Sequence, residues 1–174
     1  KGDLAKFPFR DPASGVFEVR AQVAGGTLDF AEGWPAITDI DAELLFTGPT
    51  MRITAKGGRI FGTSIRQAVA EIADLEATTV LTVRGQVAGP TGDFLRYIEA
   101  SPVGGMIDHA TRELAAEGNG LLDLDLYLPL YDMDASRVAG SYRFDDNRAF
   151  VDPALPWLTN LRGTLRFTHH DVSA

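Results

Sequence analysis

Apolar and polar residues alternate along much of this chain. The clearest run is residues 122–128, where a leucine occupies every second position and Asp123, Asp125 and Tyr127 lie between them. Alternation also marks residues 17–23, 39–47, 51–55, 67–72, 79–88, 136–144 and 161–168. Because successive side chains of a strand point to opposite faces of a sheet, each run predicts a strand with one apolar and one polar face. Closely spaced strands of this kind are typical of an antiparallel sheet.

Short turn-forming sequences separate the runs. The candidates are Gly25-Gly26, Gly48-Pro49, Gly57-Gly58 and Asp145-Asp146-Asn147. Glycine, aspartate and asparagine tolerate the positive φ angles of tight turns, so we predict a hairpin turn at each. The expected strand regions are then 17–88 and 118–168.

Residues 91–117 depart from alternation. Phe94, Leu95 and Ile98 fall at helical spacing, and Ser101-Pro102 is predicted to end the first helix. A second amphipathic helix is predicted from Pro102, with Met106, Ile107, Ala110 and Leu114 on one face. About 25 residues cannot bury a core of their own, so we expect a helical insertion within one domain.

The sequence contains an internal repeat at an offset of 121 positions. Residues 17–47 overlay residues 138–168 without a gap. The matched positions include Gly25-Gly26 with Asp146-Asn147, Pro35 with Pro156, and Ile40, Leu44 and Phe46 with Leu161, Leu165 and Phe167. We expect the two segments to form equivalent units of one continuous sheet, as in repeat proteins that bury their faces by stacking.

Composition excludes several functional classes. The chain has 16 Lys and Arg against 24 Asp and Glu, a net charge of −8, which argues against nucleic-acid binding through phosphate contacts. With no Cys it has no disulfide framework, cysteine zinc site or thiol catalysis. No apolar run approaches the roughly 20 residues of a membrane-spanning helix. Because it begins Lys1-Gly2-Asp3, without Met or a signal peptide, we expect a fragment of a longer protein.

No catalytic or cofactor-binding motif is present. The sequence His169-His170-Asp171 is interpreted as a polar tail, and His109 as part of a solvated helix face. Neither is accompanied by a positioned nucleophile or by a G-x-S-x-G or H-E-x-x-H motif. We therefore expect a protein that is not an enzyme, and no cofactor.

Four aspartates are a candidate calcium site. Asp123 and Asp125 share one strand face, and Asp132 and Asp134 follow shortly after. The spacing lacks the glycine and the terminal glutamate of an EF-hand loop. We prefer a solvated strand face, and predict no metal.

Four segments carry a resemblance to a known family. They are Leu4–Arg10 (LAKFPFR), Leu28–Ile40 (LDFAEGWPAITDI), Leu81–Ser101 (LTVRGQVAGPTGDFLRYIEAS) with Pro102 after it, and Gly118–Pro129 (GNGLLDLDLYLP). In this order they resemble the YhdP branch of the AsmA-like proteins, which are related to TamB. The match extends over nearly the whole chain, and none of its motifs is catalytic.

The resemblance implies a fold and a function. It implies a mainly β fold, a curved antiparallel sheet forming an open, taco-like repeating β-groove, of which residues 1–174 are a fragment. It also implies a periplasmic bridge anchored in the inner membrane of Gram-negative bacteria. Along that bridge phospholipids move toward the outer membrane, whose biogenesis and permeability barrier depend on them. The expected partners are phospholipid acyl chains and other envelope proteins.

The apolar strand positions are the expected lining of the groove. They are Phe17, Val19, Val23, Ile40, Leu44, Phe46, Leu81, Val83, Leu122, Leu124, Leu126, Leu128, Tyr142, Phe144, Leu165 and Phe167. Periodicity alone favours a closed core, as in a structural, scaffolding β-domain whose own chain covers its apolar face, and the open groove is what the resemblance implies. The helical insertion either caps the groove or completes an ordinary core, and the sequence leaves both open.

Overall fold

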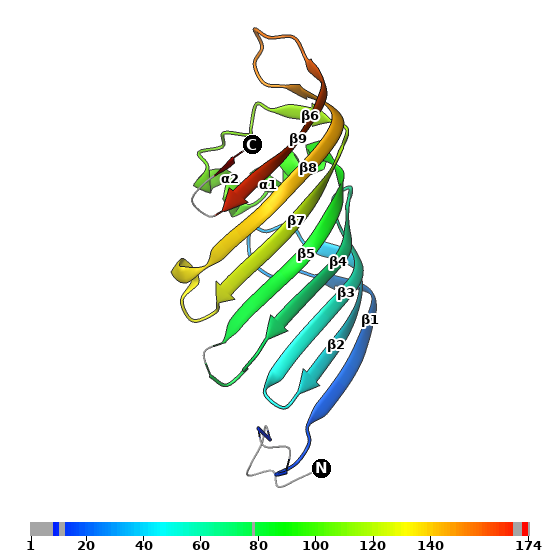
Figure 1. Ribbon diagram of the computed structural model, residues 1–174, viewed down its shortest axis with the longest axis vertical. Helices are drawn as coiled ribbons and strands as arrows, with labels where there is room; N and C mark the ends of the chain where they lie inside the picture. The colour runs from blue at the N-terminus through cyan, green and yellow to red at the C-terminus, as the bar shows by residue number, and fades with distance from the viewer. Residues whose placement is uncertain (1–8, 11–12, 78, 169–171, 174) are drawn as a thin grey trace.

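The computed structural model describes residues 9–10, 13–77, 79–168 and 172–173. Its elements form one antiparallel sheet in the order β1-β2-β3-β4-β5-β7-β8-β9-β10, with β6 paired to β8 (Figure 1). Before the helices lie β1 (Glu18–Leu28), β2 (Ile37–Thr47), β3 (Thr50–Ile60), β4 (Thr63–Ile72) and β5 (Val80–Pro90). Then come α1 (Thr91–Glu99), α2 (Pro102–Met106), β6 (Ala115–Glu117), β7 (Asn119–Pro129), the 3-10 helix η2 (Met133–Ala135), β8 (Arg137–Phe150), β9 (Leu158–Thr168) and β10 (Val172–Ser173).

This architecture confirms the predicted fold class. The fold is mainly β, and its sheet is curved and antiparallel. Among the described residues no pairing joins β1 to β10, so the sheet does not close into a barrel. Neighbouring strands in Figure 1 follow one another in chain order, with the helices between β5 and β7 as the main interruption. Local hairpins therefore build almost the entire sheet.

Three of the predicted turns are wrong. Gly25-Gly26 lies inside β1, Gly57-Gly58 inside β3, and Asp145-Asp146-Asn147 inside β8. At each place the strand pairing shifts register, so the chain makes an irregular step, or β-bulge, and continues. Gly25 and Asp146 have positive φ angles, which suit bulges as well as turns, whereas Gly57 and Gly58 do not. The prediction at Gly48-Pro49 is confirmed, because that turn joins β2 to β3.

The repeat is confirmed by strand register. Each pair between β1 and β2 has its counterpart 121 positions later between β8 and β9, from Glu18–Thr47 and Ala139–Thr168 to Leu28–Ile37 and Ala149–Leu158. The register shifts also coincide, at Gly26 in the first hairpin and at Asn147 in the second. The two hairpins are therefore equivalent units within one sheet.

The helical insertion is shorter than predicted. After α1, helix α2 ends at Met106, and residues 107–113 form turns instead of continuing an amphipathic helix. Gly104 and Gly105 weaken the helix, and Asp108 and His109 take positive φ angles of 50° and 54° that no helix accommodates. The segment then returns to the sheet as β6.

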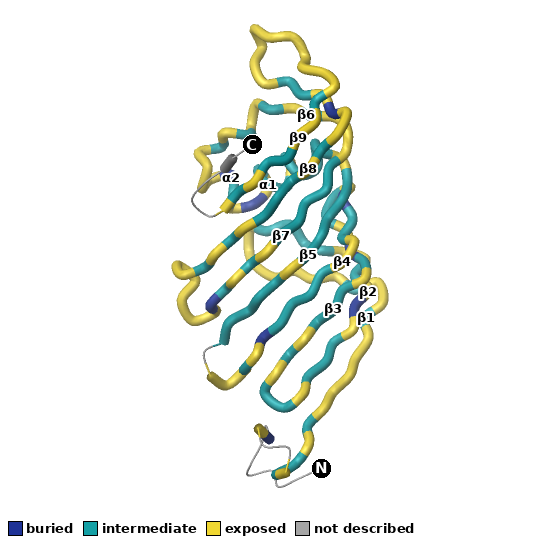
Figure 2. Tube along the Cα trace, in the orientation of Figure 1, coloured by how far each residue is buried: buried dark blue, intermediate teal, exposed yellow. Residues whose placement is uncertain are grey.

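The sheet is a single layer. The solvent-accessible surface is 11174 Å², whereas a compact protein of this mass exposes roughly 8300 Å². Among the described residues only Phe9, Ala42 and Ile72 are buried hydrophobic residues. Figure 2 shows the same result along the strands, where intermediate exposure prevails and buried positions are rare. Apolar strand residues are thus covered mainly by their neighbours in the sheet.

Candidate functional site

One face of the sheet is apolar across all its long strands. Residues that are directly paired across neighbouring strands are both apolar: Phe46 lies opposite Met51, Ile72 opposite Leu81, and Leu81 opposite Leu128. The next row joins Ala21, Leu44, Ile53, Ala70, Val83, Leu126 and Val138 in the same way. Paired residues of an antiparallel sheet share a face. We call this surface the apolar face.

The predicted lining residues are brought together on this face. All of them except Phe17 and Ile40 occupy cross-strand pairs that belong to the apolar face. Ile40 joins it through the bulge, since a Cβ built on Gly58 would lie 3.7 Å from Ile40 Cγ1 and 3.1 Å from Ile65 Cδ1. Phe17 lies just before β1, where its carbonyl accepts a hydrogen bond from the Gly48 amide.

A row of small residues on this face was not among the predicted lining residues. Ala42, Ala55, Ala68, Gly85 and Gly140 lie on the apolar face, interrupted by Leu124. Alanine and glycine carry a weak hydropathy signal, so only their position in the alternation could have identified them. A Cβ on Gly140 would lie 2.4 Å from Phe167 Cζ, so that glycine gives the ring of the neighbouring strand room to lie across it.

Helix α1 covers one end of the apolar face. The Phe94 ring packs edge-on against Tyr142 with centroids 5.0 Å apart, and Thr91 Oγ1 lies 2.8 Å from the Tyr142 hydroxyl. Asn147, only 3% exposed, donates from Nδ2 to Thr91 Oγ1 at 2.6 Å. Burial raises the pKa of the Tyr142 hydroxyl, although the Thr91 hydrogen bond opposes the shift. The insertion therefore packs on the end of the face near Tyr142.

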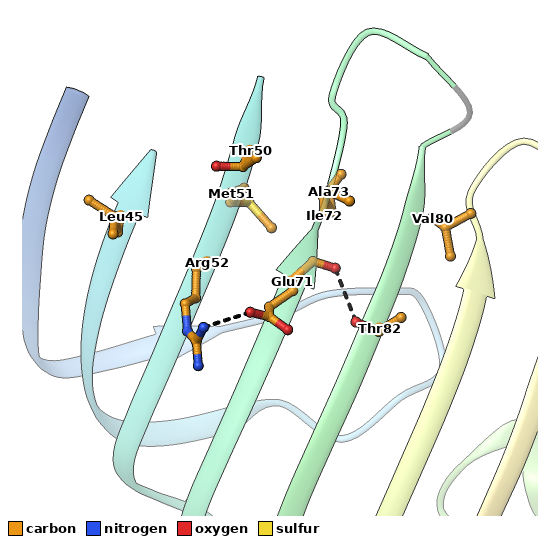
Figure 3. A pocket seen from close by; sticks show the side chains of 9 residues that line it. All are labelled: Leu45, Thr50, Met51, Arg52, Glu71, Ile72, Ala73, Val80 and Thr82. Atoms are coloured by element: carbon orange, nitrogen blue, oxygen red, sulfur yellow. Dashed lines mark hydrogen bonds and ion pairs between the residues drawn. The ribbon is translucent and has the colours of Figure 1, made fainter. Parts of the chain in front are cut away.

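The loop between β1 and β2, residues 29–36, reaches the same helices; we call it the strap loop. In Figures 1 and 3 it passes behind β3, β4 and β5, on the side away from the viewer. Its Trp34 ring packs against Tyr97 of α1, with centroids 6.2 Å apart, and against Phe30 at 5.8 Å. Burial raises the pKa of Tyr97 to about 12. The strap loop thus ties the β1–β2 edge of the sheet to α1.

The opposite face of the sheet is polar and is the one seen in Figure 3. Cross-strand ion pairs cover it, such as Arg52 with Glu71 at 2.9 Å and Lys56 with Glu43 at 2.7 Å. A hollow of about 470 Å³ lies there, lined by Leu45, Thr50, Arg52, Glu71, Ala73, Val80 and Thr82, and bounded also by Met51 and Ile72, which the strand pairing assigns to the apolar face. Exposed pairs of this kind add little stability, so we read this face as the solvated side of the sheet.

The four aspartates considered as calcium ligands do not come together at one site. Asp123 bonds to Gln86 Nε2 at 2.8 Å and to Arg143 at 3.1 Å, and Asp125 pairs with Arg84 at 3.1 Å. Asp132 and Asp134 lie beyond the end of β7, around η2. Within the described ranges no group of three or more acidic or histidine side chains comes together as a metal site.

The interpretation of His109 as part of a solvated helix face is wrong. It lies in the turns after α2, is half-buried, and its Nδ1 is 2.7 Å from Glu99 Oε2. Thr111 donates to the other oxygen of Glu99 at 2.6 Å, and these bonds hold the pKa of that carboxyl below its ordinary value. His109 therefore fastens the turn to α1. His169, His170 and Asp171 lie outside the described residues.

None of the described helices is long and apolar enough to cross a membrane.

Comparisons of the sequence with known proteins point to one family. The family model described as YhdP protein matches residues 1–174. The intermembrane phospholipid transporter YhdP of Escherichia coli (strain K12) is 25% identical over 173 residues, which cover 99% of this chain and 13% of that protein. The chain thus spans about one eighth of the length of this relative. No solved structure matches it. With its whole length matched by the family model, the chain belongs to the YhdP protein family.

Proposed function

We propose that the apolar face is a groove for phospholipid acyl chains within a bridge protein that moves phospholipids between the inner and outer membranes. The observation that carries the proposal is the apolar face of a single-layer sheet, which α1 and the strap loop cover only in part. The total surface is 11174 Å², and three hydrophobic residues among those described are buried. A large, continuous apolar patch on the surface of a protein usually marks a site where a ligand, a membrane or another protein binds. The name of the E. coli relative supports lipid as the occupant.

Acyl chains suit this surface energetically. The apolar face offers side chains of similar hydrophobicity in successive rows, such as Leu44, Ile53, Val83 and Leu126, without a polar group between them. Covering about 200 Å² of it contributes about 5 kcal/mol at ~25 cal/mol per Å². Because this attraction is non-directional, a chain can shift along the rows at little cost. The lipid headgroup would remain in water at the open side of the sheet.

The proposal includes a setting. As part of a bridge of repeating units, the fragment would lie in the periplasm, and the full protein would be anchored in the inner membrane. The module would be non-catalytic, as the name of its transporter relative suggests, and the His109–Glu99 contact would serve to fasten a turn.

The competing function is a structural β-domain of an envelope protein whose apolar face is closed by protein. Native mass spectrometry of the chain purified from bacteria separates the two. A groove predicts co-purified phospholipid that is lost on delipidation and regained from phosphatidylethanolamine–phosphatidylglycerol vesicles. Protein that never carries lipid, with or without vesicles, would support the closed domain.

A further inference from the structure

The loop between β8 and β9, residues 151–157, occupies in the second repeat the place of the strap loop in the first. The strap loop leaves the sheet after the Leu28–Ile37 pair, and residues 151–157 leave it after the equivalent Ala149–Leu158 pair. No gap separates the two segments in the alignment at an offset of 121. The two loops therefore start and end at the same points of the repeat.

The two loops also share a backbone turn. In the strap loop, the Trp34 amide donates to the carbonyl of Ala31 at 3.2 Å. In the second loop, the Leu155 amide donates to the carbonyl of Asp152 at 3.0 Å, and these two residues are the counterparts of Trp34 and Ala31. Each loop thus contains a hydrogen-bonded turn at the same position of the repeat.

The residues that anchor the strap loop have apolar counterparts. Phe30 corresponds to Val151, Trp34 to Leu155, and Pro35 to Pro156. In the strap loop the first two form the aromatic contact that packs on Tyr97. The anchor positions of the second loop thus keep their apolar character and the proline that follows.

The surroundings of the two loops differ. Trp34 is half-buried against α1, and a Cβ on Gly33 would lie 3.9 Å from Pro102 of α2. Residues 151–160 are all exposed, with Leu155 at 51% and Val151 at 41%, and Figure 2 shows this loop projecting beyond the end of the sheet. A loop built like a strap thus stands without the helices on which its counterpart rests.

We propose that residues 151–157 form a second strap loop, whose partner is a helix pair equivalent to α1–α2 in a following repeat of the same polypeptide. In the first repeat four strands, β2 to β5, separate the strap loop from its helices along the chain, and the loop crosses the sheet to reach them. The same spacing places the partner of the second loop beyond residue 174. The contact of the strap loop with Tyr97 and Pro102 indicates what the partner's surface should contain. We expect an aromatic ring on an amphipathic helix, followed by a short helix that begins with proline. Each strap would thus tie the start of its own repeat to the helices near its end.

A tandem chain tests this proposal. Residues 48–168 are duplicated immediately after Thr168, a position equivalent to Thr47, so the junction keeps register and face. The duplication supplies a second copy of α1 and α2 at the spacing that the proposal requires. Since the chain has no Cys, a pair introduced as Leu155→Cys in the first copy and Tyr97→Cys in the second can be joined by a short bismaleimide without background. The matched control is the Trp34→Cys, Tyr97→Cys pair in the same tandem chain.

Both pairs are expected to crosslink within one molecule and with similar yield. Hydrogen exchange of residues 151–157 should slow by roughly tenfold relative to the 174-residue chain, which corresponds to about 1.4 kcal/mol of docking. Crosslinking of the control pair without the Leu155 pair would overturn the proposal, as would unchanged exchange.

A second measurement does not depend on the folding of the tandem chain. A benzophenone amino acid at position 155 of the full-length protein is expected to crosslink to a helix that follows residue 174. Crosslinks only to other proteins, or only to residues 1–168, would contradict the proposal. Neither experiment involves lipid, so both are independent of the function proposed above.

Discussion

Asp39 and Asn160, which lie 121 positions apart, adopt the same left-handed backbone conformation, with φ angles of 52° and 54°. Each lies in the second strand of its hairpin beside the register shift. The opposite strand repeats the agreement, since Gly25 and Asp146 have φ angles of 64° and 57°. Aspartate, asparagine and glycine are the residues that tolerate this region best. The bulge is thus a conserved structural feature of the two repeats. Different residues form it, and all of them tolerate a positive φ angle.

This requirement gives a first prediction. Replacing Asp39 with valine should lower the free energy of unfolding by about 1–2 kcal/mol, because a β-branched residue clashes with its own backbone at positive φ. Asp39→Gly should stay within about 0.5 kcal/mol of the original chain. Urea denaturation measures both, with Thr38→Val as the control at an exposed neighbouring position. Equal losses for Asp39→Val and Thr38→Val would argue against backbone strain at the bulge.

The strap loop gives a second prediction, with its control inside the same chain. Trp34→Ala should lower stability by about 1–3 kcal/mol, because a half-buried indole leaves Tyr97. Leu155→Ala, at the equivalent position of the other loop, should cost under about 0.5 kcal/mol in the 174-residue chain. Denaturant titration of the two variants compares them directly. A larger loss for Leu155→Ala would mean that the second loop is already docked.

The third prediction concerns the apolar face. Leu126→Glu should remain soluble and melt cooperatively with a modest loss of stability, since a carboxylate on an open face can reach water. It should lose bound phospholipid in native mass spectrometry and fail to restore the outer-membrane permeability barrier in cells. Asp125→Asn, on the polar face of the same strand, is the control and should change neither.

The opposite outcome for Leu126→Glu has a clear meaning. In a closed core, the unpaired charge costs several kcal/mol and unfolds a small domain. An insoluble or molten variant, together with lipid-free original protein, would therefore favour the structural β-domain.

The fourth prediction concerns pH. Hydrogen bonds from Thr111 and His109 lower the pKa of Glu99 in the folded protein below its ordinary value of 4.5. A lowered folded-state pKa stabilises the protein above the unfolded-state pKa, and this stabilisation is lost as pH falls through the folded-state value. Glu99→Gln should therefore lower the Tm at pH 7, and the difference should shrink below about pH 4.5.

Calorimetry from pH 3 to pH 7 checks this expectation, with Glu113→Gln as the control on an exposed carboxylate of the same segment. A Tm difference for Glu99→Gln that persists unchanged at pH 3 would show that the ionised carboxylate contributes nothing.

The sequence predicts the sheet well because alternation is a local signal. The leucines at 122–128 identify their own strand and face, and the offset of 121 matches β2 to β9 residue for residue. Gly25-Gly26 was misassigned because a bulge and a hairpin turn require the same φ angles, and only the pairing of the opposite strand distinguishes them.

The site was less accessible to prediction where it depends on distant contacts. Trp34 meets Tyr97 only because the strap loop passes behind β3, β4 and β5 to reach α1, which no periodicity encodes. Ala68 and Gly85 belong to the apolar face through their partners in the sheet, and their own hydropathy is uninformative. The turn at His109 depends on Glu99, ten residues earlier, and on backbone angles outside the helical range.

The matching registers of the two hairpins set a unit of length. In the sheet order, β8 lies six strands beyond β1. At roughly 4.8 Å between neighbouring strands, one repeat advances the sheet by about 29 Å. Because six is an even number, equivalent strands of successive repeats run in the same direction. Their apolar residues lie on the same face of the sheet. A sheet that gained or lost a whole repeat would therefore change its length in steps of this size. No strand would be reversed, and no polar residue would move onto the apolar face.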